Sequence, residues 1–128
     1  MLASLKSLLE LHMSTRTVIE TYFKSLERKK GWESLLTDDV VFTSYAIPNR
    51  QIAGKQPYIE ATTRFYASIQ SFELRALMVE GSKACAQTRY RLAGPAGPFH
   101  SDVAEIFTVR DGKIDSLGIY FDSAPFPK

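Results

Sequence analysis

The second half of this sequence holds four strand-forming stretches in a row, and this feature limits the possible folds more than any other. The stretches cover residues 72–80, 84–92, 101–109 and 114–122, and each is rich in β-branched or aromatic residues. Short turn segments separate them, of which Asp111-Gly112 is the strongest hairpin signal. Successive strands with short connections pair antiparallel, so the sequence predicts an antiparallel sheet.

The first half begins with a helical pattern. Ser14 or Thr15 can cap a helix that ends at the basic cluster 28–30 and Gly31. Cations favour the negative end of a helix, and glycine tolerates the left-handed conformation that often ends one. Apolar residues recur at spacings of three and four and predict one buried stripe: Val18, Ile19, Tyr22, Phe23 and Leu26.

Further elements precede the run of strands. A shorter helix is expected over 32–36, ended by residues 37–39, and a strand over 40–45. Residues 47–50 form a predicted loop, and a third helix covers about 54–69. Helices segregated from antiparallel strands indicate the α+β class, and a chain of 128 residues fits one domain. A curved sheet around three helices would leave a hollow at one end.

Composition excludes several function classes. Sixteen basic and fourteen acidic residues give a net charge of only +2, so we expect no nucleic-acid partner. Cys85 is the single cysteine, which rules out an intrachain disulfide and favours a reducing, cytoplasmic compartment. With only His12 and His100 beside it, we expect no metal site and no cofactor.

The amino-terminal segment 1–13 is leucine-rich, but Lys6 and Glu10 interrupt it. We interpret it as an amphipathic helix or extension of the domain, not as a signal peptide. No stretch reaches the roughly 18 apolar residues that a membrane-spanning helix needs, so no membrane partner is expected.

Three sequence segments resemble a known family. They are residues 21–26 with 31–32 and 35–42, residues 52–55, and residues 105–114 with 119–122. Together they resemble the nuclear-transport-factor-two-like superfamily, and within it the SnoaL-like branch, which is related to polyketide cyclases and ketosteroid isomerases. The resemblance implies a cone-shaped, cystatin-like α+β barrel with three amino-terminal helices on a strongly curved, mostly antiparallel sheet. It also implies a pocket and frequent dimerisation through the outer sheet face, but it does not select an activity.

Strand alternation singles out Glu105. Val103, Phe107 and Val109 share its face of the strand, so one carboxylate lies in an otherwise apolar row. Burial there would raise the pKa of Glu105 and make it a candidate general acid. The alternative is an outward Glu105, paired with Arg89 or Arg91 across the hairpin.

Comparison with the ketosteroid isomerases supports this choice and also limits it. The resemblance implies that Glu105 stands where those enzymes hold a protonated Asp, and that Tyr22 and Tyr66 match two of their hydrogen-bonding tyrosines. Ser44, however, occupies the place of their general base, and a serine hydroxyl cannot abstract a carbon-bound proton unaided. Steroid isomerisation by that mechanism is therefore disfavoured. The Asp-Arg-Asp set of the epoxide hydrolases is not matched either, since alternation turns Arg89 and Arg91 outward.

These observations predict a small hydrophobic molecule as the partner. The acid/base group would be Glu105, with Tyr22, Tyr66 and His100 orienting the ligand in an isomerase, cyclase or hydrolase. Both tyrosines also suit a buried helix face, and His100 suits a solvated loop, so each has a purely structural interpretation. The predicted pocket wall comprises Trp32, Phe42, Ser44, Phe65, Tyr90, Phe107, Leu117, Ile119 and Phe121.

Two further expectations concern assembly and activity. The outward row of Ile106, Thr108 and Tyr120 is apolar enough to predict a homodimer through the outer sheet face. The missing carboxylate at Ser44 keeps a second function open, namely a non-catalytic ligand-binding or dimerisation module of the same fold.

Overall fold

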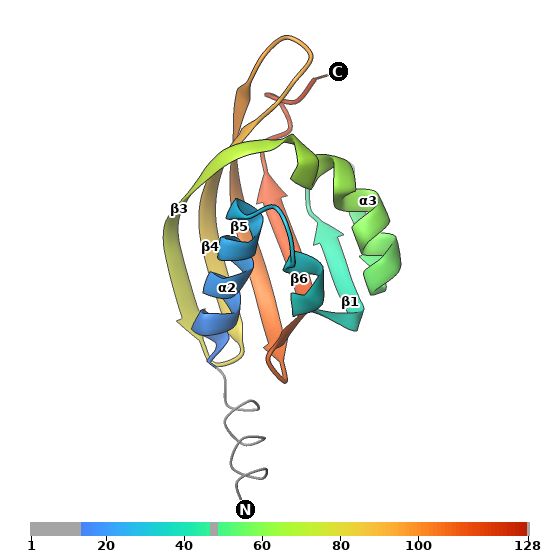
Figure 1. The fold of residues 1–128 in the computed structure, drawn as a ribbon, viewed down its shortest axis with the longest axis vertical. Helices are drawn as coiled ribbons and strands as arrows, with labels where there is room; N and C mark the ends of the chain where they lie inside the picture. Colours follow the sequence, from blue (N-terminus) through green and yellow to red (C-terminus); the bar gives the residue numbers. More distant parts are fainter. Residues whose placement is uncertain (1–13, 47–48, 128) are drawn as a thin grey trace, which may run out of the picture.

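The computed structural model describes residues 14–46 and 49–127, which form an α+β domain with one mixed sheet (Figure 1). The sheet has six strands in the order β2-β1-β6-β5-β4-β3. Only the β1–β6 pair is parallel. The helices are α2 (Thr15–Glu27), the 3-10 helix η1 (Trp32–Leu35) and α3 (Lys55–Ser68). The strands are β1 (Leu36–Ser44), β2 (Arg50–Ala53), β3 (Ile69–Glu80), β4 (Lys83–Leu92), β5 (Phe99–Arg110) and β6 (Lys113–Phe121).

The run of four strands is confirmed as β3 to β6, each paired antiparallel with the next. The turn between β5 and β6 has positive φ angles of 52° at Asp111 and 78° at Gly112. Two consecutive residues with positive φ form the tight hairpin turn that matches the twist of the flanking strands. The dipeptide therefore determines where β5 stops and how β6 returns.

The first helix is also confirmed, and its amino-terminal cap is Ser14. The backbone N–H of Thr17 donates to Ser14 Oγ over 3.1 Å, which caps α2 at its first turn. At the other end the left-handed residue after the C-cap Arg28 is Lys29, with a φ of 57°, whereas Gly31, with a φ of 89°, is the N-cap of η1. The apolar stripe faces the sheet, and Val18, Ile19 and Tyr22 have no exposed surface.

Two predicted elements differ from the structure. The second helix is only the four-residue 3-10 helix η1, and the segment 37–39 belongs to β1. Leu36 already pairs with Ile114 of β6, so sheet pairing replaces the expected helix end. The sequence reading also missed β2, a four-residue strand that pairs with β1 and begins at Arg50, in the predicted loop. Such a short strand carries too little alternation to be recognised.

Both helices cover the same face of the sheet, with α2 against β3 and β4 and α3 against β1 and β2 (Figure 1). The main core lies between them and the sheet, and a smaller apolar cluster surrounds Ile69, Tyr90, Leu92 and Val103. The sheet is open, with β2 and β3 at its edges. The cone-shaped barrel and strong curvature implied by the resemblance are therefore not confirmed.

Some predicted features lie outside the described residues, namely the amino-terminal helix at 1–13 and positions 47–48 of the loop. No helix within the described ranges is long and apolar enough to cross a membrane.

Candidate functional site

A cavity of about 360 Å³ lies between α3 and the inner face of the sheet. This is near the lower end of the volumes typical of small-molecule sites. Its wall is mostly apolar, with Glu105 as the one carboxylate and Arg50 as the one cation among the described lining residues. The wall consists of Phe42, Ser44, Ala46, Arg50, Ile52, Tyr58, Ala61, Thr62, Phe65, Tyr66, Tyr90, Ser101, Val103, Glu105, Leu117, Ile119, Phe121 and Phe126.

Glu105 reaches this cavity because β5 alternates strictly between its two faces. Ser101, Val103, Glu105 and Phe107 are buried, and the residues between them are exposed or half-buried. Only 4% of Glu105 remains exposed. The outward alternative, with Glu105 paired to Arg89 or Arg91, is therefore wrong.

Two side chains of β4 hold the Glu105 carboxylate. Thr88 Oγ1 donates to Oε2 over 2.9 Å, and the Tyr90 hydroxyl donates to Oε1 over 2.9 Å and to Oε2 over 3.0 Å. Both donors lie on the inner face of β4, where Ala86 is the direct partner of Glu105 in the register. The carboxylate is thus fixed in position by the strand that pairs with its own.

The environment tunes the protonation of Glu105. Burial raises the pKa of this carboxyl from an ordinary 4.5 to about 7, because the charged form loses its hydration. The hydrogen bonds from Thr88 and Tyr90 act in the opposite direction and lower the pKa. Near neutral pH, both the acid and its conjugate base are therefore populated, which is the condition for general acid/base catalysis.

A chain of three tyrosine hydroxyls lies beside the cavity. The Tyr66 hydroxyl is 2.6 Å from that of Tyr22 and 2.7 Å from that of Tyr58. Burial raises the pKa of all three groups, so they stay neutral and each keeps one proton. Two hydrogen bonds within the chain use two of these protons, which leaves one of the three hydroxyls able to donate elsewhere. Tyr58 and Tyr66 line the cavity and Tyr22 does not.

The structure separates some predicted site residues from the cavity. Tyr22 packs edge-on against Phe107, with ring centroids 5.5 Å apart, and both belong to the core. The Trp32 ring stacks on the Tyr66 ring, with ring centroids 4.1 Å apart, and supports it without lining the cavity. His100 is exposed, because on β5 it alternates with the buried Ser101. The side chains that hydrogen-bond to Glu105 are Thr88 and Tyr90, and not the predicted tyrosines Tyr22 and Tyr66.

The structure brings the other predicted residues together on the cavity wall, where their binding roles stay predictions. Leu117, Ile119 and Phe121 come from β6, where alternation turns them toward α3. The predicted residues on the wall are Phe42, Ser44, Phe65, Tyr66, Tyr90, Glu105, Leu117, Ile119 and Phe121.

The sequence reading missed several wall residues. Tyr58 is not among the predicted site residues, although it lies about two turns before Tyr66 on the same helix. Ser101 shares the inner row of Glu105, so strand alternation carried a signal for it. Arg50 comes from the unrecognised strand β2, and Phe126 from the segment after β6. Phe126 packs on Phe99 and Phe121, a contact that only the tertiary structure decides.

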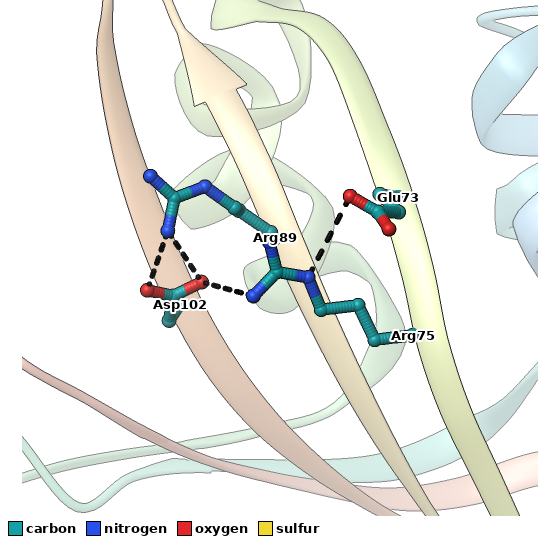
Figure 2. Close-up of polar contacts among 4 residues, drawn as sticks. All are labelled: Glu73, Arg75, Arg89 and Asp102. Carbon is teal, nitrogen blue, oxygen red and sulfur yellow. Dashed lines mark hydrogen bonds and ion pairs between the residues drawn. The ribbon is translucent and has the colours of Figure 1, made fainter.

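The opposite face of the sheet carries a cluster of four charged side chains on β3, β4 and β5. In this cluster Asp102 forms ion pairs with both arginines (Figure 2). Its Oδ2 lies 3.0 Å from Arg89 Nη1, and its Oδ1 lies 3.9 Å from Arg75 Nη1. Glu73 Oε2 lies 3.5 Å from Arg75 Nε. An Asp-Arg-Asp set inside the cavity is therefore not formed by these residues. Within residues 14–46 and 49–127, no cluster of His, Cys, Asp or Glu is suited to a metal ion.

Sequence comparison decides the family. The profile of the SnoaL-like domain matches residues 19–117, which is most of the chain. This protein is a member of the SnoaL-like domain family. The expected superfamily and branch are thereby confirmed. None of the curated proteins matches this SnoaL-like chain in sequence.

Solved structures show the same fold at low identity. The epoxide hydrolase/cyclase-like enzyme SalBIII, which has a role in pyran ring formation in the polyether salinomycin, has a TM-score of 0.78 at 13% identity, with 91% of this chain and 96% of that chain covered. A nuclear-transport-factor-two-like protein of unknown function from Cytophaga hutchinsonii has a TM-score of 0.69 at 17% identity, with 88% of this chain and 93% of that chain covered. A de novo designed protein with a curved β-sheet scores 0.68 at 19% identity, covering 84% of each chain. A fold shared with a designed protein indicates architecture and not activity.

Proposed function

We propose that this SnoaL-like protein binds a small, largely apolar molecule in the cavity and that Glu105 acts on it as a general acid/base. The observation that carries the proposal is Glu105, a residue that is only 4% exposed, lines a cavity and has a carboxyl pKa raised to about 7. A buried ionisable group with this pKa in a concave, apolar site is the usual mark of an active site.

The reaction must need only one acid/base group, because Glu105 is the single carboxylate among the described wall residues. An intramolecular ring closure meets this condition. Neutral Glu105 would give its proton to an epoxide oxygen as the C–O bond breaks, while a hydroxyl oxygen of the same substrate forms the new C–O bond. The proton of that hydroxyl then returns to the Glu105 carboxylate, so the enzyme ends as it began. The role of SalBIII in pyran ring formation supports a cyclase of this kind.

The tyrosines would assist by placing a hydrogen-bond donor at the reacting oxygen. If Tyr22 donates to Tyr66 and Tyr66 to Tyr58, the free proton lies on Tyr58, which lines the cavity. A fixed donor in a water-poor cavity stabilises negative charge on a substrate oxygen more than the same donor in water. Isomerisation of an unsaturated ketone uses the same arrangement and is the second reaction class to test.

The test is Glu105→Gln, which preserves the shape of the side chain but removes its proton transfer. Wild-type protein would be screened against two sets of substrates. For bicyclic hydroxy-epoxides, chromatography detects the cyclic ether product. For β,γ-unsaturated ketones, absorbance detects the conjugated product. We expect turnover that Glu105→Gln lowers by about 10²- to 10⁴-fold. The control is Asp102→Asn on the opposite face. Turnover retained within threefold in Glu105→Gln would refute the proposed role.

A non-catalytic binding module is the second candidate, and Ser44 favours it. Ser44 lies on the cavity wall, and the resemblance to the ketosteroid isomerases implies that it occupies the place of their general base. Under this alternative, the apolar probes bind to wild type and to Glu105→Gln with equal affinity, and neither protein turns them over. Calorimetric titration together with the turnover screen separates the two functions.

We also propose a homodimer through the outer sheet face. Ile106 is 40% exposed and Tyr120 49% exposed on this face, with Thr108 beside them, and exposed apolar residues of this size favour a protein partner. Light scattering after size exclusion should show a dimer at micromolar concentration, which Ile106→Glu dissociates. A monomer in the wild type would contradict this proposal.

A further inference from the structure

Arg50 is the one cation among the described residues of the cavity wall, and the acid/base scheme gives it no role. It is the first residue of β2, the edge strand that pairs with β1. Within residues 14–46 and 49–127, the arginines that form ion pairs are Arg75, Arg89 and Arg110, and Arg50 is not among them. Arg50 therefore carries a charge that no described residue neutralises.

Strand alternation turns Arg50 toward the cavity. Arg50 and Ile52 are two residues apart on β2, so they share one face, and both line the cavity. Gln51 lies between them and turns to the opposite face, where its side-chain amide donates to Thr43 Oγ1 over 3.3 Å. Arg50 is also exposed, whereas Glu105 is buried. The Arg50 side chain thus belongs to the open part of the cavity, where solvent and a ligand can both reach it.

One row of paired residues across four strands connects Arg50 with Glu105. Arg50 is paired with Ser44 of β1, Ser44 with Ile119 of β6, and Ile119 with Glu105 of β5. All four residues line the cavity. Neighbouring strands are about 4.8 Å apart, so the Cα atoms of Arg50 and Glu105 are about 14 Å apart. The cation and the acid/base group therefore lie at opposite ends of one row on the same face of the sheet.

The next row on this face is apolar. Ile52 of β2 is paired with Phe42 of β1, and Phe42 with Leu117 of β6. These three residues line the cavity beside the row that joins Arg50 to Glu105. An apolar ligand body can therefore lie along the sheet, with one end at the cation and the other end at the acid/base group.

We propose that Arg50 binds a carboxylate of the ligand, and that the ligand is an apolar skeleton with this carboxylate at one end and its reacting oxygen at the Glu105 end. This inference rests on the proposed function of the cavity, and it adds the charge of the ligand and the placement of its polar groups. A guanidinium is planar, and its paired N–H donors match the two oxygens of a carboxylate. One cation in the described wall suits a singly charged group, because the second charge of a phosphate would lose hydration without gaining a partner.

The experiment compares an anionic probe with a neutral probe of the same shape. The probes are 10-hydroxydecanoic acid and its primary amide, together with the homologous pairs that are shorter and longer by two carbons. Near pH 6 the acids are ionised and Glu105 is mostly protonated, so the carboxylate of the probe is not repelled by Glu105. In wild type we expect calorimetric titration to show, for at least one pair, about three- to tenfold tighter binding of the acid than of the amide.

Three variants assign this preference to Arg50. Arg50→Gln should abolish it and leave the affinity for the amide unchanged, and Arg50→Lys should retain part of it because the charge remains. The matched control is Arg64→Gln, which removes an exposed arginine of α3 that does not line the cavity. This control changes the net charge by the same amount and should retain the full preference. Raising the NaCl concentration to about 1 M should weaken the preference in wild type, because salt screens an exposed ion pair.

The outcomes separate failure of this inference from failure of the proposed function. If the amides bind but the acids bind no more tightly, or if the preference survives in Arg50→Gln, the role of Arg50 is refuted and the binding function stands. A preference lost equally in Arg64→Gln would show attraction by net charge alone and would also refute it. If none of the probes binds to wild type, both proposals fail.

Discussion

Strand β5 carries two carboxylates on opposite faces, and their surroundings differ in almost every respect. Glu105 faces the cavity, is buried, and accepts hydrogen bonds from the neutral hydroxyls of Thr88 and Tyr90. Asp102 faces outward with 64% of its side chain exposed and contacts two arginines (Figure 2). Three residues along one strand thus separate a carboxyl suited to proton transfer from one suited to an ion pair.

The comparison teaches that the residue type does not determine the chemistry of a carboxyl; its solvation and its partners do. Among residues 14–46 and 49–127, no cation lies near enough to stabilise the charged form of Glu105, so burial dominates and raises its pKa. Asp102 keeps its hydration and has arginines within 4 Å. Four predictions test this contrast, in order of decreasing effect.

The largest effect is expected from charge reversal. Glu105→Lys would place an unpaired ammonium in the apolar interior and should lower the free energy of unfolding by at least ~3 kcal/mol. Asp102→Lys should lower it by no more than ~1 kcal/mol, because its position is exposed. Urea denaturation measures both values, and similar losses in the two variants would contradict the contrast.

The second effect is a dependence of stability on pH. Below pH 4.5 the Glu105 carboxyl is protonated in both states, and between pH 4.5 and about 7 the unfolded chain ionises while the folded protein keeps its proton. Stability contributed by Glu105 should therefore fall as pH rises through this window, by ~3 kcal/mol in total. The difference in free energy of unfolding between wild type and Glu105→Gln, measured by urea denaturation at each pH, isolates the contribution of Glu105. Asp102→Asn is the control, and its free energy of unfolding should fall with rising pH as that of wild type does. A Glu105 contribution that rises with pH in this window would refute the prediction.

The third effect concerns the hydrogen bond from Tyr90. Tyr90→Phe removes a donor that favours the charged form, so the pKa of Glu105 should rise further and the stability at high pH should drop by ~1–2 kcal/mol. The carbon-13 chemical shift of the Glu105 carboxyl, followed against pH, reports the midpoint. Tyr66→Phe is the matched control, since the Tyr66 hydroxyl bonds to Tyr22 and Tyr58 instead. A midpoint that falls in Tyr90→Phe would show that this contact does not stabilise the carboxylate.

The smallest effect is expected on the outer face. The coupling energy between Arg89 and Asp102 in a double-mutant cycle of Arg89→Gln and Asp102→Asn should be ~1 kcal/mol or less. It should nearly vanish in about 1 M NaCl, where the screening length is near 3 Å. A coupling that persists at high salt would indicate that this ion pair is more shielded than its exposure suggests.

Much of the candidate site could be read from strand alternation. The inner rows of β4, β5 and β6 matched the expected alternation, which placed Glu105, Tyr90 and Leu117 on one face. What alternation could not give is the partner of each group. Thr88 and Tyr90 reach Glu105 because of the β4–β5 register, which depends on how the loop 93–98 closes. The predicted role of His100 at the ligand differs from its observed place for a related reason. Strand β5 begins at Phe99, so strand alternation extends through His100, which was expected in a loop, and exposes its side chain.

The sequence by itself determined the local elements: the cap at Ser14, the turn at Asp111-Gly112 and the alternation that selects which side chains face inward. These depend on backbone conformation and on periodicity, both of which short segments specify alone. Only the tertiary structure decided that β2 joins the sheet, that Phe126 closes part of the cavity wall, and that Ser101 is buried without a partner. These depend on contacts between residues far apart in the chain, where packing and desolvation override local preference.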